Sequence, residues 1–145
     1  MKRRKRLVQA SLFLLAQQVI ATLYAMWQHL PFEVGGMGEP NQVARDAVTR
    51  GTAISAPVSV LIVFAAFTFL ASRGGKVGRV GAFGLVLLAG VFLIAGIMEP
   101  ILMRSLGADQ IGTREIAIVV LSAAGFSAAA LVGVLGVKNV RTKAS

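Results

Sequence analysis

The sequence predicts an all-α membrane protein, an antiparallel bundle of four transmembrane helices. Four long apolar segments occupy residues 7–30, 52–72, 80–99 and 116–137. Each is close to the roughly 20 residues that cross about 30 Å of hydrocarbon. Only 14% of the 145 residues are charged, whereas soluble domains carry about 25%. The four segments and their connections use the whole chain, so we expect residues 1–145 to form a single membrane domain.

The distribution of charges predicts how the helices are oriented. The end before the first segment, the connection after the second and the end after the fourth hold eleven basic residues and no acidic ones: Lys2, Arg3, Arg4, Lys5, Arg6, Arg73, Lys76, Arg79, Lys138, Arg141 and Lys143. The other two connections, with the adjoining segment ends, hold four basic residues and all six acidic ones. Basic loops stay in the cytoplasm. We therefore expect cytoplasmic N- and C-termini in a bacterial-type inner membrane.

The same positive charge predicts the kind of partner. A net charge of +9 in a soluble protein would suggest nucleic-acid binding. Here the basic residues flank membrane spans, so we expect no nucleic acid and instead an attraction to anionic lipids at the cytoplasmic face.

The first segment is the most polar of the four. At helical spacing one face carries a polar stripe: Ser11, Gln18, Thr22, Ala25 and His29. Such side chains either hydrogen-bond to neighbouring helices or line a path for a polar solute. A cleaved signal peptide ending near Val19-Ile20-Ala21 is an alternative. The interruption by Gln17-Gln18 and the interfacial aromatics Tyr24 and Trp27 favour an uncleaved helix.

The connections contain recognisable local signals. Residues 41–50 are amphipathic, with Asn41 as a predicted N-cap and Gly51 just past the end. They predict a short interfacial helix in the first outer loop. Pro57 suits the start of the second span. The inner turn Arg73-Gly74-Gly75-Lys76 lacks the ending and the preceding strand of a nucleotide phosphate loop, so we interpret it as a tight connection.

Small residues recur at helical spacing in the third and fourth spans. One stripe consists of Gly78, Ala82, Ala89 and Gly96 and continues to Glu99, and the other consists of Ser122, Gly125, Ala129, Gly133 and Gly136. Small side chains let helix backbones approach closely in lipid. The stripes therefore predict tight packing, either between these helices or with another subunit, in a homo-oligomer or a larger membrane complex.

Glu99 is the strongest candidate for a functional side chain, because an ionisable group at membrane depth suggests function. Two interpretations remain open. Glu99 either forms a structural cap or a salt bridge, with Arg114 as the preferred partner, or handles a ligand or protons together with His29 and Gln18. The absence of cysteine and the single histidine exclude thiolate and multi-histidine metal sites within one chain. We expect no catalytic residues, no metal and no cofactor.

Two functions are consistent with these patterns. The first is a non-catalytic packing or regulatory partner of other envelope proteins. The alternative is an oligomeric small-solute or proton-coupled transporter that uses Glu99 and the polar face of the first helix. A transporter requires a cavity that reaches the polar stripe, whereas a packing partner would seal that stripe between helices.

Overall fold

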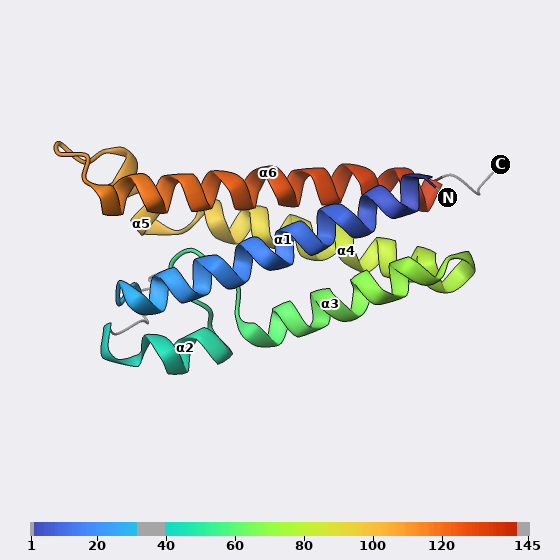
Figure 1. Ribbon diagram of the computed structural model, residues 1–145, viewed down its shortest axis with the longest axis horizontal. Helices are drawn as coiled ribbons and strands as arrows, with labels where there is room; N and C mark the ends of the chain where they lie inside the picture. Colours follow the sequence, from blue (N-terminus) through green and yellow to red (C-terminus); the bar gives the residue numbers. More distant parts are fainter. Residues whose placement is uncertain (1, 32–39, 142–145) are drawn as a thin grey trace.

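The computed structural model describes residues 2–31 and 40–141 of the chain. Their regular structure is helical apart from one antiparallel bridge between Thr52 and Ser55. The elements are α1 (Lys2–Trp27), the 3-10 helix η2 (Pro40–Gln42), α2 (Val43–Thr49), α3 (Val58–Arg73), α4 (Gly75–Ile97), α5 (Pro100–Leu106) and α6 (Thr113–Arg141). The long helices α1, α3, α4 and α6 lie side by side, and the short α2 and α5 lie at one end (Figure 1).

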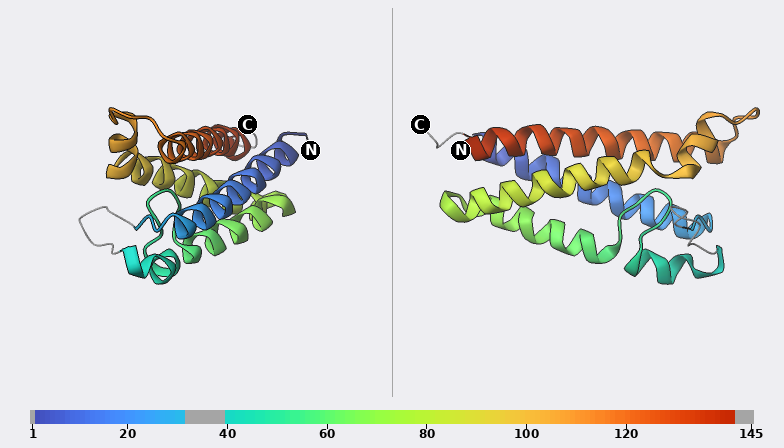
Figure 2. Two further views of the ribbon diagram at one scale, coloured as in Figure 1. Left: turned by 60° about the vertical axis from the view of Figure 1, so that its left-hand side comes forward. Right: turned by 180° about the vertical axis from the view of Figure 1, so that it is seen from behind.

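The four long helices enclose a common apolar core. Helix α1 packs against α3 and α6, and α4 packs against the same two helices, an arrangement that Figure 2 shows from two further sides. Leu14, Leu85 and Val132 contribute fully buried side chains from three of the helices. Phe64 of α3 stacks on Phe92 of α4, with ring centroids 5.5 Å apart. The core therefore draws on all four helices.

Three helices, α1, α4 and α6, are long and apolar enough to cross a membrane, which points to a membrane protein. Helix α3 is apolar but has only 16 residues. It begins at Val58 rather than near residue 52, because Pro57 is extended (φ −55°, ψ 144°) and residues 52–55 form a turn. The other three long helices begin earlier than their apolar segments, because the flanking polar residues continue the helix in each case.

The two connections at the end of the bundle opposite the chain termini contain two short helices. The predicted helix in the first connection is present as α2, with Gln42 rather than Asn41 at its N-cap. The N–H groups of Arg50 and Gly51 both donate to the Asp46 carbonyl at 2.7 Å, and Gly51 has φ +93°, a conformation that suits glycine. The sequence patterns did not predict α5, in which Pro100 occupies the first turn. Residues 32–39 of the first connection lie outside the described residues.

The small residues serve several different contacts. Ala82, Ala89 and Ala129 are buried in the core. Gly96 lies against the Phe126 ring of α6, whereas a Cβ on Gly78 would lie 3.5 Å from the Ala71 carbonyl of α3 and one on Gly125 would lie 3.1 Å from the Gln17 amide of α1. Beside Gly133 there is no atom within 4 Å of a built Cβ. A Cβ on Gly136 of α6 would lie 3.2 Å from the Ala82 carbonyl of α4. The two predicted stripes therefore meet at that position, whereas Gly78 and Gly125 contact other helices.

The closest approach of backbones involves a glycine outside the predicted stripes. A Cβ on Gly81 would overlap the Ala71 nitrogen and lie 2.7 Å from both the Leu70 carbonyl carbon and the Phe67 oxygen. Because the atoms it would meet are backbone atoms of α3, no side-chain movement can relieve the overlap. Gly81 therefore sets the distance between α3 and α4.

We predict that Gly81→Ala lowers stability by about 1–3 kcal/mol, because the two helices must move apart. Gly90→Ala is the matched control in the same helix, since nothing lies within 4 Å of its built Cβ, and it should be neutral or slightly stabilising. Titration of purified protein from mild detergent into sodium dodecyl sulfate, followed by circular dichroism, measures the difference. Equal midpoints for the two variants would contradict the close approach.

Candidate functional site

A cavity of about 210 Å³ lies between the long helices, toward the end of the bundle that holds α2 and α5. Drug-sized ligands occupy pockets of about 300–1,000 Å³, so this cavity suits a smaller molecule. Its walls come from α1, the segment 51–57, α3, α4, α5 and α6. The polar side chains that line it are Gln17, Gln18, Arg50, Thr52, Ser55, Glu99 and Ser122.

The late start of α3 places a non-helical segment in the wall of this cavity. Thr52 N–H donates to the Ser55 carbonyl at 3.0 Å, and the two hydroxyls lie 2.7 Å apart. A Cβ on Gly51 would lie 2.6 Å from the Ser55 oxygen, so the turn requires glycine there. Residues 51–57 thus form a compact turn between α2 and α3, and most of them line the cavity.

Gln18 and Gln17 connect this segment to the helices on both sides of α1. The Ala56 N–H donates to Gln18 Oε1 at 2.8 Å. Gln18 Nε2 donates to Gln17 Oε1 at 2.8 Å, and Gln17 Nε2 donates to the Leu121 carbonyl of α6 at 2.8 Å. Each amide group keeps a further donor and acceptor site in principle. The pair therefore joins three parts of the chain and also lines the cavity.

Thr22 extends the same hydrogen-bond network toward the end of α1. Its hydroxyl lies 2.9 Å from the Gln18 carbonyl and 2.8 Å from the Ser55 hydroxyl. Ser11, Gln18, Thr22 and Ala25 of the predicted polar stripe are all buried. The spacing argument therefore identified a buried face of α1 correctly for these four positions.

Glu99 lies where α4 ends and α5 begins. It occupies the N-cap position of α5 with an extended backbone (φ −77°, ψ 117°), but its side chain makes no capping hydrogen bond. The residue is only 4% exposed and lines the cavity. The break between the helices thus places a carboxyl group against the same cavity as the two glutamines.

The remaining walls are largely apolar and aromatic. Phe92 of α4 and Phe126 of α6 both line the cavity. The Phe126 ring lies against Gly96, where a side chain would collide with it. The cavity therefore combines an apolar wall with hydrogen-bonding groups contributed by α1, residues 51–57 and Glu99.

The structure brings together two of the four predicted binding residues. Gln18 and Glu99 both line the cavity. His29 is exposed and adopts φ +52° just after α1, where the His29 and Leu30 N–H groups donate to the Met26 and Ala25 carbonyls. This is the hydrogen-bond pattern of a Schellman motif. Arg114 is exposed in the first turn of α6 and does not line the cavity.

Other lining residues were not predicted as binding groups. Gln17 lies beside the polar stripe and bonds to α6 rather than to the segment 51–57. From the sequence we expected Ser122 to pack against another helix and Arg50 to belong to the interfacial helix. Arg50 approaches Asp46, with 4.0 Å between Nη1 and Oδ1. Among these three residues only Gln17 was noticeable in the sequence, because two adjacent glutamines are unusual in an apolar segment.

Comparison of the chain with protein-family models, with curated proteins and with solved structures finds no match.

We predict that Gln18→Leu destabilises the protein by about 1–3 kcal/mol, because the Ala56 N–H loses its acceptor. Gln9→Leu changes an exposed glutamine of the same helix and should have little effect. Amide hydrogen exchange measured by NMR provides a local readout, in which the Ala56 amide should exchange faster in Gln18→Leu alone. Unchanged protection of Ala56 would show that Gln18 does not hold this segment.

Proposed function

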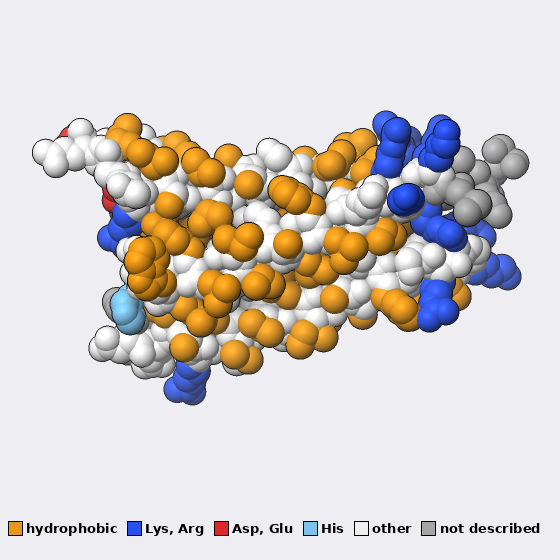
Figure 3. Space-filling view, in the orientation of Figure 1, with side chains coloured by type: hydrophobic (Ala, Val, Ile, Leu, Met, Phe, Trp, Pro, Cys, Tyr) orange, Lys and Arg blue, Asp and Glu red, His pale blue; other side chains and the backbone are white. Residues whose placement is uncertain are grey.

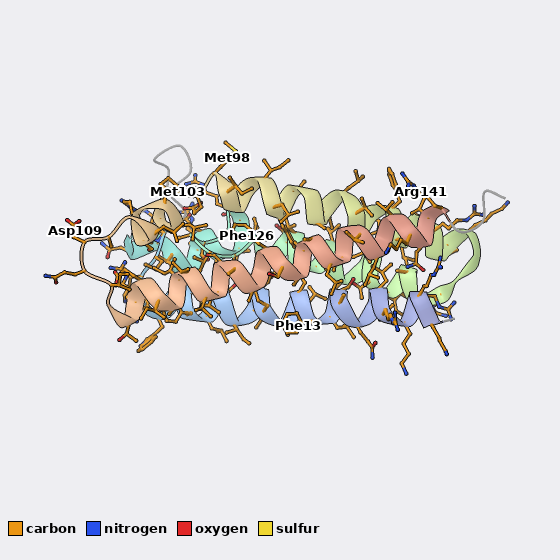
Figure 4. All side chains as sticks on the ribbon, turned by 90° about the horizontal axis from the view of Figure 1, so that it is seen from above. Phe13, Met98, Met103, Asp109, Phe126 and Arg141 are labelled. Carbon is orange, nitrogen blue, oxygen red and sulfur yellow. The ribbon has the colours of Figure 1, made fainter. Side chains whose placement is uncertain are left out.

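We propose that the chain crosses a bacterial-type inner membrane four times, as an antiparallel bundle with both termini in the cytoplasm. The support is the separation of charge along the molecule. Basic side chains gather at the end where α1 begins and α6 ends, beyond a largely apolar surface (Figure 3). Asp109 lies at the opposite end from Arg141 (Figure 4). Asp46, Glu99 and Glu115 belong to elements at that opposite end as well.

In this proposal α3 is a short fourth span and α2 is an interfacial helix. Helix α2 contacts α1 and α3 at the outer end. It buries Val43, Asp46 and Ala47 while Ala44 and Val48 stay exposed. An exposed apolar edge on a short helix at this depth suits the boundary between headgroups and acyl chains.

Reporter fusions test the four crossings. We expect fusions after Lys76 and after Ser145 to report the cytoplasm, and fusions within Gly35–Gly38 and after Gly112 to report the periplasm. The fusion after Lys76 is decisive because α3 has only 16 residues. If α3 does not cross, this fusion will report the periplasm and the four-span topology fails.

We further propose that the protein binds a small solute in the outer cavity, as the binding step of a small-solute or proton-coupled transporter. The observation that carries this proposal is the position of Glu99 beside Gln17 and Gln18 around one cavity. A bundle that serves only to pack against partner proteins does not require a cavity next to its buried polar side chains. Four-helix bundles commonly form ligand sites between facing helices.

The walls indicate the chemical class of the solute. Phe92, Phe126, Val60 and Leu102 offer apolar contact, whereas the glutamine amides and Glu99 offer hydrogen bonds at one side. A small, mostly apolar molecule with one or two hydrogen-bonding groups fits this division. Arg50 also lines the cavity, so the polar side contains both signs of charge and does not require an ionic solute.

We predict that Ser122→Leu abolishes solute binding by filling the cavity, whereas Ser127→Leu on the exposed face of α6 leaves it intact. Glu99→Gln should weaken binding roughly tenfold, corresponding to about 1.4 kcal/mol for one lost charge-assisted hydrogen bond. Thermal-shift assays of purified protein with single-ring phenols, amides and alcohols measure binding, and circular dichroism checks the fold. Equal shifts in Ser122→Leu and Ser127→Leu would rule out this cavity as the site.

A second candidate function is the packing or regulatory partner of other envelope proteins. It is favoured by Gly133, a half-buried glycine of α6 with open space beside it among the described residues, because a small residue at such a place lets a partner helix approach closely. The same preparations distinguish the two functions. An envelope protein that co-purifies equally with wild type and Ser122→Leu, without any solute-induced shift, would support the packing partner.

A further inference from the structure

A second cavity lies at the opposite end of the molecule from the proposed solute site. It is a groove of about 490 Å³ between the start of α1, the α3–α4 turn and the end of α6. Within the described part of the chain, its lining includes the basic residues Lys2, Arg3, Arg4 and Arg79 and no acidic residue. Four like charges around one concave surface produce a strong positive potential that attracts an anion.

The fold holds one of these charges over the turn. Gly74 has φ +79°, and a Cβ built on it would collide with Nη1 of Arg4. The Arg4 guanidinium therefore lies against the bare backbone of the turn, and the Arg4 residue is only partly exposed. This contact joins the basic segment of α1 to the α3–α4 connection, two regions that lie about 70 residues apart in the sequence.

The start of α4 lies at the same groove, separated by one residue from the end of α3, whose dipole has the opposite sign. Helix α4 has 23 residues and begins at Gly75, which lines the groove. The first N–H groups of a helix lack partners within the helix, and the helix dipole is positive at this end. Phosphate groups commonly bind in such positions. The helix end and the basic side chains of α1 and α4 thus face the same groove.

The inner wall of the groove is apolar. Leu7, Ala71 and Ala82 line it and are at most 2% exposed. These side chains are too deeply buried to hold an acyl chain, so they form the closed floor of the groove. On the membrane topology proposed above, the groove lies at the level of the cytoplasmic headgroups, where anionic lipids supply phosphate groups. We propose that this groove binds the phosphate headgroup of an anionic phospholipid. The site is independent of the proposed solute cavity, because the two share no lining residue.

Phospholipid retention by the purified full-length protein tests the site. The protein is expressed in membranes of mixed lipids, purified in mild detergent and exchanged against equal amounts of phosphatidylglycerol and phosphatidylcholine. Native mass spectrometry then gives the ratio of the two bound lipids. We expect wild type to retain phosphatidylglycerol in at least tenfold excess, since each basic residue near a bilayer surface contributes appreciably to anionic lipid binding.

A pair of matched double variants separates a built site from diffuse attraction. Arg4→Gln with Arg79→Gln removes two arginines of the groove. Arg6→Gln with Arg73→Gln removes two exposed arginines, one on α1 and one at the end of α3, that do not line it. Both variants lose the same charge. We expect the groove variant to retain roughly tenfold less phosphatidylglycerol than the control variant.

Equal losses in the two double variants would overturn the proposal in favour of diffuse surface charge, and no loss in either would overturn it outright. Inorganic phosphate added at millimolar concentration provides a further arm. Displacement of the lipid by free phosphate would show an anion site without lipid preference and contradict the lipid assignment. If the groove double variant does not fold, Arg79→Gln against Arg73→Gln gives the same comparison, because both arginines are exposed.

Discussion

The non-helical segment 51–57 is the constraint on which the rest of the described structure depends. In apolar surroundings an unpaired backbone N–H costs several kcal/mol, so irregular backbone at membrane depth persists only where protein or a cavity satisfies it. Gln18 accepts a hydrogen bond from the Ala56 N–H and donates one to Gln17. Gln17 in turn donates to the Leu121 carbonyl of α6. The late start of α3 leaves backbone groups outside any helix, and Gln17 and Gln18 in the middle of α1 provide hydrogen bonds there. The short α3, the cavity and the two glutamines are therefore structurally linked.

The length and apolarity of the segments were sufficient to predict helices, because a long apolar segment has few other ways to hydrogen-bond its backbone N–H and C=O groups. They could not place the start of α3. Residues 52–57 are apolar enough to continue the helix. They are kept out of it by the extended Pro57, by the hydrogen bonds between Thr52 and Ser55, and by the hydrogen bond from Ala56 to Gln18. Helix α5 escaped prediction for a similar reason, since its seven residues are too few for a periodic pattern to stand out.

The candidate site was predictable in part. Gln18 and Glu99 are costly in hydrocarbon, and this cost drew attention to them whatever the fold. Gln18 and Glu99 line the same cavity because α4 and α5 are separated by a break and because α3 starts late. The spacing of residues along the sequence predicts neither feature. His29 illustrates the opposite case. Its helical spacing placed it on the polar stripe, but α1 ends before it and its backbone turns to a positive φ.

The length of α3 has a consequence for the surrounding bilayer. On the four-span topology proposed here, its 16 residues give an apolar length of about 24 Å, against roughly 30 Å for typical hydrocarbon. The lipids that border α3 must therefore thin, whereas those that border the 29 residues of α6 need not. Such one-sided hydrophobic mismatch costs fractions of a kcal/mol for each ångström. The protein would therefore have a lower free energy in thin bilayers. Two copies would also associate through their α3 sides, because fewer lipids then have to thin around them.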